Sequence, residues 1–162
     1  MSHPKQADLA AIIEALVSGG VEFIVVGGAA AILHGAPTST LDLDIVHRRT
    51  EDNVDRLYAV LRDLDAFHRD PAGRQLRPSR DALAGTGQLN LSTSLGPLDP
   101  LCVLHDGRGY DDLVANTVEM RDGNIVIRVI DLPTLIAIKA KTGRARDRIL
   151  LPILGALLDE ES

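Results

Sequence analysis

Apolar positions along the chain follow two spacings, which separate expected helices from expected strands. Apolar residues recur every three or four positions in 8–17, 51–64 and 131–141, which predicts amphipathic helices. Short β-branched or alternating runs, such as VEFIVV at 21–26 and LDLDIVH at 41–47, predict strands. The expected helices are 8–17, 29–34, 51–64, 110–115 (a turn), 131–141 and 144–158; the expected strands are 21–26, 41–47, 88–93, 98–104, 117–120 and 125–130.

Residues that begin, end or bend elements support this division. Thr50 and Asp131 precede apolar-periodic segments and are expected to cap two helices, and Gly143 is expected to end the second. Pro152 is expected to kink the last helix. Residues 67–84 show no period and are interpreted as a loop or irregular arm. Strands mixed with helices predict an α/β (α+β) fold, with a mixed β-sheet flanked by helices and with C-terminal helices.

Composition narrows the class of protein. A chain of 162 residues is expected to form a single domain over 1–162. Its net charge of −6 argues against a general nucleic-acid coat, and its single cysteine excludes an internal disulfide and a multi-cysteine zinc site. No apolar run reaches the ~18 residues of a membrane span, and the N-terminal segment lacks the apolar stretch of a signal peptide. We therefore expect a cytoplasmic protein without membrane contact.

Two aspartates two positions apart are the first candidate for chemistry. Asp42 and Asp44 lie on the expected strand 41–47, so their side chains should share one face. Adjacent carboxylates repel unless a cation neutralises them, and hard cations such as Mg²⁺ prefer carboxylate and phosphate oxygens. The alternative is a pair of solvated aspartates on an edge strand, and the D-x-D pattern alone does not decide between the two.

The context of this pair favours a nucleotide site. Gly27-Gly28 lie between a buried strand and a short helix, where glycine permits close approach of a phosphate to the backbone. Asp99 lies on the later apolar strand 98–104, where a charge needs a partner; the alternative is a turn aspartate with local hydrogen bonds. Three carboxylates on neighbouring strands suit two metal ions and in-line phosphoryl displacement.

The segment VEFIVVGGAAAILHGAPTSTLDLDIV at 21–46 resembles the signature of the DNA polymerase β-like nucleotidyltransferase superfamily. Within it, the chain is most similar to the AbiEii-type nucleotidyltransferases of abortive-infection and toxin–antitoxin systems. The segments LGPLDPLCV, GRGYDDLV and IRVIDLPTLIAIKAKTGRARD carry the same resemblance, which covers most of 21–158.

The resemblance implies a fold and a set of roles. Gly27 and Gly28 would lie at the nucleotide phosphates, and Asp42 and Asp44 would bind catalytic Mg²⁺ (or Mn²⁺). Asp99 would be the third carboxylate, acting as metal ligand or as general base. The K…R-x-x-D pattern implies that Lys139 and Asp147 help to bind the triphosphate of an NTP and to order the site. Many relatives carry an arginine at the position of Thr38, whereas Thr40 is retained.

Several polar residues near these motifs allow two interpretations, one functional and one structural. The hydroxyls of Ser39 and Thr40 are candidates for a phosphate contact, although Ser and Thr in loops usually cap turns. The basic residues of 139–148 suit a triphosphate or an RNA backbone, or form an ordinary exposed helix face with pairs such as Arg144–Asp147. The arginines of 69–80 could steer a polyanion or keep a loop soluble. His34, His47 and Cys102 are interpreted as structural, Cys102 as a small buried hydrophobe.

Two functional hypotheses follow. The first is a Mg²⁺-dependent, ATP- or NTP-binding nucleotidyltransferase that moves NMP to a hydroxyl of RNA, tRNA or protein, as a toxin in a toxin–antitoxin system would. The second is a catalytically weakened binding module, an antitoxin or partner subunit bound to a cognate toxin–antitoxin protein, which Thr38 in place of arginine motivates.

Overall fold

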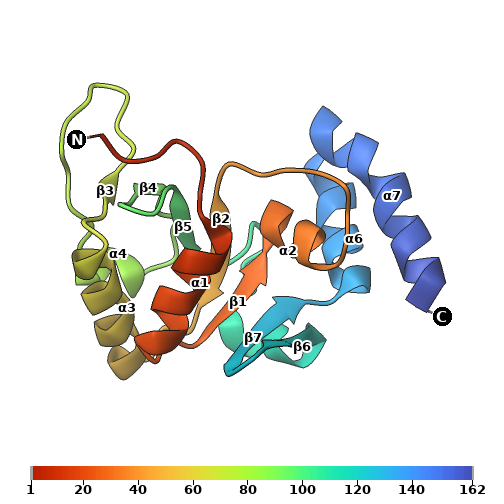
Figure 1. The fold of residues 1–162 in the computed structure, drawn as a ribbon, viewed down its shortest axis with the longest axis horizontal. Helices are drawn as coiled ribbons and strands as arrows, with labels where there is room; N and C mark the ends of the chain where they lie inside the picture. The colour runs from red at the N-terminus through yellow and green to blue at the C-terminus, as the bar shows by residue number, and fades with distance from the viewer. Residues whose placement is uncertain (1, 162) are drawn as a thin grey trace.

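The computed structural model describes residues 2–161 and joins all its strands into one mixed sheet (Figure 1). The helices are α1 (Leu9–Ser18), α2 (Gly27–Leu33), α3 (Glu51–Asp63), α4 (Arg80–Leu83), α5 (Tyr110–Leu113), α6 (Leu132–Thr142) and α7 (Ala145–Glu161), with a 3₁₀ turn η1 (Val114–Asn116). The strands are β1 (Phe23–Val26), β2 (Leu43–His47), β3 (Phe67–His68), β4 (Leu91–Ser92), β5 (Leu98–Leu101), β6 (Thr117–Asp122) and β7 (Ile125–Ile130). The expected mixed sheet with flanking helices is confirmed.

The order of the strands places two of the acidic segments side by side. The sheet runs β3-β4-β5-β2-β1-β7-β6, so β2 lies between β1 and β5 at its centre. Strand β2 pairs antiparallel with β1, which puts Val26 opposite Asp44, and parallel with β5, which puts Asp44 opposite Asp99. The end of β1, and with it the Gly27-Gly28 turn, therefore faces the start of β2.

Thr50, Asp131 and Gly143 cap helices as expected, and Asp8, which was not predicted as a cap, begins another. The side chains of Asp8, Thr50 and Asp131 accept backbone N–H bonds at the starts of α1, α3 and α6. Gly143 ends α6 in the left-handed conformation, at φ +68°, where a Cβ would be unfavourable. The chain turns there into α7, so that α6 and α7 stand together at one end of the molecule, with α3 and α4 at the other (Figure 1).

The boundaries of several elements differ from the expectation. The predicted strands 88–93 and 98–104 are shorter, because β4 is a two-residue strand and the chain leaves β5 after Leu101. The arm 67–84 contains the short strand β3 and the single-turn helix α4, neither of which was expected. Strand β3 is only two residues long, too short for an alternating pattern to be visible in sequence. Pro152 lies inside α7, which extends to Glu161.

One apolar cluster holds the sheet and helices together. It combines the central strands with one face each of α1, α2 and α3, and Ile24, Ile45 and Leu57 are completely buried within it. Burying each such side chain contributes roughly 1.5–3 kcal/mol. Within residues 2–161, no helix combines the length and apolar character needed to cross a bilayer.

Candidate active site

The turn after β1 is built to touch β2 without side chains of its own. Gly27 adopts φ +64°, and a Cβ at this position would lie 2.6 Å from Oδ2 of Asp44. A Cβ on Gly28 would lie 2.9 Å from Oγ1 of Thr40. Both positions therefore require glycine for close packing, and Gly27 also requires it for its backbone conformation. The turn forms a surface of bare backbone directly beside the carboxylates of β2.

Three carboxylates from two strands converge at this point. Asp42, immediately before β2, Asp44 and Asp99 each offer an oxygen, and these oxygens all lie within 4.8 Å of one another. Asp99 is only 2% exposed, whereas Asp42 and Asp44 are partly exposed. The parallel register of β2 and β5 creates this cluster, since it sets Asp44 opposite Asp99.

The electrostatics of the cluster call for a cation. Burial, followed by repulsion from Asp42 and Asp99, raises the pKa of Asp44 from 3.8 to about 7. Burial also raises the pKa of Asp99, against the opposing effect of Arg69. Oδ1 of Asp44 is buried and has no hydrogen-bond partner among residues 2–161. An all-oxygen donor set with an unsatisfied buried oxygen suits Mg²⁺ or Mn²⁺, so these residues fit a hard divalent ion.

One cation is already present in the cluster, and the sequence did not identify its role. Arg69, which follows β3, donates from Nη1 to Oδ1 of Asp99 at 2.7 Å and from Nη2 to Oδ2 at 2.9 Å. Its Nη2 also lies 4.0 Å from Oδ2 of Asp42. Arg69 stands in the irregular arm, where no periodicity indicates which way a side chain points. The arginine content of the arm was the only signal.

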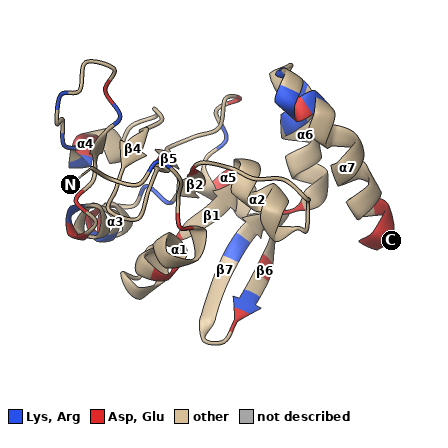
Figure 2. Ribbon diagram, turned by 45° about the horizontal axis from the view of Figure 1, so that its top comes forward, with Lys and Arg blue, Asp and Glu red and all other residues tan. Residues whose placement is uncertain are grey.

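A second group of charges lies at the junction of α6 and α7. Lys139 and Asp147 are both buried and form an ion pair of 3.1 Å between Nζ and Oδ1. The other oxygen of Asp147 accepts a hydrogen bond from Oγ1 of Thr142 and one of 3.0 Å from Nε of Arg144. The pair Arg144–Asp147, predicted for an ordinary exposed helix face, is present, whereas the ion pair between Lys139 and Asp147 was not predicted. Figure 2 shows that lysines and arginines gather at this junction.

The two groups share one cavity, here named the carboxylate pocket, of about 180 Å³. It is lined by Gly27, Gly28, Thr38, Thr40, Asp42, Asp44, Gln88, Asp99, Lys139, Arg144, Arg146, Asp147 and Leu150. Eight of the nine residues predicted from sequence are in this set. Ser39 is not; it is exposed, and its carbonyl oxygen accepts a hydrogen bond of 2.8 Å from Nη2 of Arg146. Gln88 was not predicted, since a glutamine in a loop carries no distinguishing pattern.

Thr40 organises the approach to the carboxylates. It is 7% exposed, and its Oγ1 lies 3.2 Å from both the backbone oxygen and Oδ1 of Asp42. The hydroxyl therefore orients the first carboxylate and packs against Gly28. This is a positioning role within the chain, and the phosphate contact stays a prediction.

The remaining polar candidates are engaged elsewhere. Nε2 of His34 bonds the carbonyl of Ile130, and Nε2 of His47 bonds that of Leu83. Cys102 is completely buried, as expected. The other arginines of the arm all pair with carboxylates: Arg74 with Asp70, Arg77 with Asp65 and Arg80 with Asp55. These arginines are therefore already paired, which argues against the interpretation that they steer a polyanion.

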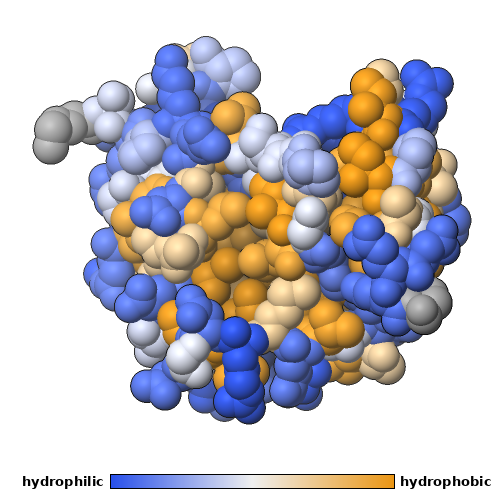
Figure 3. All heavy atoms as spheres, turned by 45° about the vertical axis from the view of Figure 1, so that its right-hand side comes forward, coloured by the Kyte–Doolittle hydropathy of each residue, from blue (hydrophilic) through white to orange (hydrophobic). Residues whose placement is uncertain are grey.

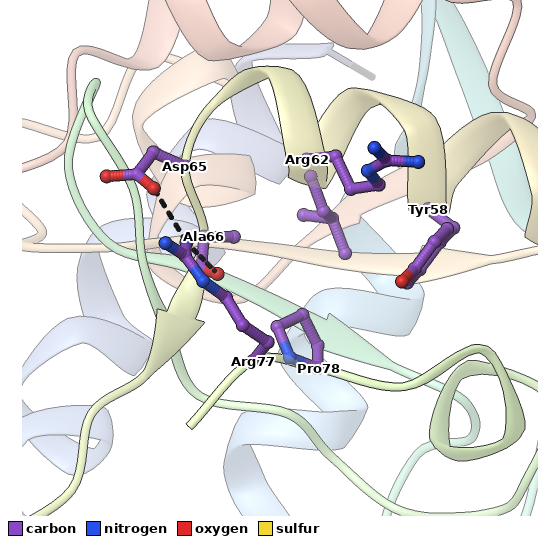
Figure 4. Close-up of a pocket in the computed structure, with 7 residues that line it drawn as sticks. Tyr58, Arg62, Asp65, Ala66, Arg77 and Pro78 are labelled. Atoms are coloured by element: carbon purple, nitrogen blue, oxygen red, sulfur yellow. Dashed lines mark hydrogen bonds and ion pairs between the residues drawn. The ribbon is translucent and has the colours of Figure 1, made fainter. Parts of the chain in front are cut away.

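A larger cavity of about 240 Å³ lies away from the carboxylates, between α3 and the arm (Figure 4). It is lined by Tyr58, Leu61, Arg62, Asp65, Ala66, Arg77 and Pro78. Arg77 is already neutralised there. Its Nη1 lies 2.7 Å from Oδ1 of Asp65 and donates a hydrogen bond of 3.0 Å to the carbonyl oxygen of Ala66. Its lining brings together no cluster of acidic groups, so the carboxylate pocket is the better candidate for chemistry.

Known structures share this architecture. A protein from Thermotoga maritima with a provisional nucleotidyltransferase assignment aligns with 94% of this chain and 91% of its own, at a TM-score of 0.53 and 19% identity. The lincosamide antibiotic adenylyltransferase LnuA, bound to lincomycin, aligns with 95% of this chain and 99% of its own, at a TM-score of 0.62 and 13% identity. The chain has the fold of these nucleotidyltransferases. No family model and no curated protein matches the sequence.

Proposed function

We propose that this protein is a divalent-metal-dependent nucleotidyltransferase that moves NMP from an NTP to an acceptor hydroxyl. The observation that carries the proposal is the convergence of Asp42, Asp44 and Asp99 within 4.8 Å, directly beside the Gly27 turn. The shared fold with an adenylyltransferase supports the same class of reaction. A bare backbone turn, paired carboxylates and a basic wall are the components that in-line phosphoryl displacement requires.

Different residues of the pocket would bind the metal ion and the triphosphate. Asp42 and Asp44 would hold Mg²⁺ or Mn²⁺, which supplies charge neutralisation for the phosphates when bound. The Gly27-Gly28 turn would admit the phosphates close to the backbone. Arg144 would face the triphosphate from the α6–α7 side of the pocket. Lys139 and Asp147 are buried against each other, so we propose that they mainly fix the geometry of that side.

The proposed transfer makes one bond and breaks one. The acceptor oxygen bonds the α-phosphorus, the bond from that phosphorus to the oxygen bridging toward the β-phosphorus breaks, and pyrophosphate leaves. The hydroxyl proton passes to water, because both oxygens of Asp99 already accept hydrogen bonds from Arg69. Because no covalent intermediate forms on the protein, catalysis would consist of positioning and charge neutralisation.

Arg146 offers a guanidinium near Thr38, the position at which many relatives carry an arginine. Thr38 lines the carboxylate pocket, and Arg146 of α7 lines it too while bonding the carbonyl of the neighbouring Ser39. A guanidinium therefore reaches the same loop from a different element. This favours the enzyme over the alternative of a catalytically weakened binding module, because the pocket retains cationic groups for phosphates.

The acceptor and the biological setting are finer parts of the proposal. We propose a polymeric or protein acceptor, RNA, tRNA or a protein hydroxyl, and a toxin–antitoxin role of the AbiEii type, on the sequence resemblance of 21–46. Leu41 and Ile149 are 63% and 73% exposed and adjoin Asp42 and the pocket-lining Leu150. Figure 3 shows further hydrophobic side chains gathered across one face. Such apolar surface suits a partner protein or an acceptor with an apolar part.

The test is transfer of label from each α-³²P-NTP to RNA, protein and small-molecule hydroxyl fractions, with Mg²⁺ or Mn²⁺. Wild type should label one fraction and release pyrophosphate, and Asp44→Asn should lose at least a hundredfold in rate. Asp122→Asn, at an exposed position of β6, is the matched control and should keep full activity. Wild-type labelling no greater than that of Asp44→Asn in every fraction, together with no Mg²⁺-dependent ATP binding by calorimetry, would favour the binding module instead.

A further inference from the structure

Arg69 is held in the carboxylate cluster by three hydrogen bonds. Its two terminal nitrogens bond both oxygens of Asp99, at 2.7 and 2.9 Å. Nη1 also donates to the carbonyl of Leu91 at 2.6 Å, and the N–H of Leu91 lies 3.3 Å from Oδ1 of Asp99. A planar guanidinium in bidentate contact with a carboxylate is among the stronger ion-pair geometries. Strand β4 thus fixes both partners of the pair.

The guanidinium leaves the other two carboxylates largely available. Nη2 approaches Oδ2 of Asp42 only to 4.0 Å, beyond hydrogen-bond distance. Oδ1 of Asp42 accepts from the hydroxyl of Thr40, and Oδ1 of Asp44 is buried without a partner. The cluster is therefore asymmetric, since the chain itself neutralises its Asp99 side, whereas no cationic side chain of residues 2–161 forms an ion pair with Asp44.

Charge balance makes this asymmetry significant. The positive charges of one divalent ion and one guanidinium together balance the negative charges of three ionised carboxylates. A second divalent ion near Asp99 would have to approach Arg69, whose side chain is 35% exposed and so only partly screened. It would also have to compete for carboxylate oxygens that the guanidinium already uses.

We propose that Arg69 is a built-in counter-cation that takes the place of a second metal ion, so that the nucleotide-free protein binds one divalent cation, through Asp42 and Asp44. The inference rests on the metal site of the proposed function and specifies its stoichiometry. Arg69 is a positioning residue in this account, because it acts through Asp99. Removing its charge should open the Asp99 side of the cluster to a second ion.

The experiment is Mn²⁺ titration of the full chain without nucleotide, followed by electron paramagnetic resonance. Wild type should bind one Mn²⁺ per chain, with the spectrum of an isolated ion. Arg69→Gln should bind two ions whose spins couple, since both would lie within the cluster. Arg69→Lys keeps the charge and should still bind one. Arg69→Gln/Asp99→Asn removes the charge and the third carboxylate together and should also bind one.

The outcomes separate this inference from the proposed function. A coupled pair of ions in wild type would overturn the role of Arg69 while leaving the metal site intact. A single ion in a folded Arg69→Gln protein would overturn it equally. Absence of Mn²⁺ binding in wild type and Arg69→Gln alike would remove the metal site itself. Should Arg69→Gln fail to fold, Arg69→Met, which also removes the charge, is titrated in its place, and two coupled ions would support the inference whereas a single ion would overturn it.

Discussion

Asp44→Asn should stabilise the metal-free protein, although it removes a residue that the proposed reaction requires. In the folded chain the carboxylate of Asp44 lies beside Asp42 and Asp99, and its Oδ1 has no partner. Asparagine has nearly the same shape without the charge. The substitution therefore removes the repulsion and desolvation that the ionised aspartate suffers in the fold.

The magnitude follows from the pKa of Asp44, which rises from 3.8 to about 7. Each pKa unit corresponds to about 1.4 kcal/mol, so ionising this group in the fold costs at most about 4 kcal/mol. Asp44 is only partly buried, and solvent screening reduces the figure. We expect Asp44→Asn to raise the free energy of unfolding by about 2 kcal/mol at pH 8 in EDTA, which is half of that upper limit.

The pH dependence of this gain distinguishes charge from packing. Because the folded pKa of Asp44 lies above the unfolded one, the folded wild type binds more protons between pH 3.8 and about 7, and loses stability as the pH rises through that window. The difference between variant and wild type should be smallest at pH 5, grow toward pH 7 and level off above it.

Urea unfolding at pH 5, 6, 7 and 8, with and without Mn²⁺, measures this difference. Mn²⁺ should stabilise wild type and leave Asp44→Asn unchanged, because the ion binds only the folded wild-type site. Asp122→Asn, exposed on β6, should match wild type throughout. The reasoning would be refuted if Asp44→Asn were less stable than wild type at pH 8 in EDTA, or if the gain were the same at every pH.

Three further predictions concern neighbouring features. Burial lowers the pKa of His47 from 6.5, so the unfolded chain binds more protons than the folded chain below that pH, and the wild type should lose stability as the pH falls. The free energy of unfolding of His47→Gln, measured in urea between pH 7.5 and 5, should therefore depend less on pH than that of wild type. The same pH dependence in both proteins would contradict this. Gly27→Ala should weaken Mn²⁺ binding at least tenfold by calorimetry, because the new Cβ would collide with Asp44. Gly73→Ala has similar backbone strain, at φ +74°, but open space around its Cβ, and should not weaken binding. Equal losses in the two variants would exclude contact with Asp44 as the cause. Lys139→Met should cost about 3 kcal/mol in urea unfolding by leaving Asp147 buried with a weaker set of partners, and adding Asp147→Leu should restore most of it; no recovery would argue against a buried ion pair.

Periodicity predicted the long elements of the fold because their sequence patterns are set by burial. Helices α1, α3 and α6 carry both an apolar stripe and a capping side chain, and they form within one or two residues of the expected bounds. Strands β3 and β4 are two residues long each and pair mainly through tertiary context. The pattern of 88–93 indicated β4 but not its short length, and no local pattern indicated β3. The interpretation of 67–84 as wholly irregular missed β3 and α4 for this reason.

The candidate site likewise combines features that the local sequence predicts with features that only tertiary structure reveals. Asp42 and Asp44 are neighbours in sequence, and their shared face follows from strand geometry alone. Asp99 joins them only through the parallel register of β2 and β5. The resemblance implied that Asp99 is the third carboxylate, but neither it nor the spacing gave this register. The bidentate contact of Arg69 with Asp99 depends on where an aperiodic arm returns to the sheet, so only the three-dimensional structure reveals it.

The central claim is that the carboxylate pocket holds a metal ion and the triphosphate of a nucleotide together. A crystal structure with Mn²⁺ and an NTP whose α,β-bridging oxygen is replaced by a methylene group tests it most directly. The account predicts anomalous scattering from Mn²⁺ on Asp42 and Asp44, with the α-phosphate beside Gly27 and the outer phosphates toward Arg144. Mn²⁺ bound elsewhere on the chain, or a triphosphate bound outside this pocket, would contradict it.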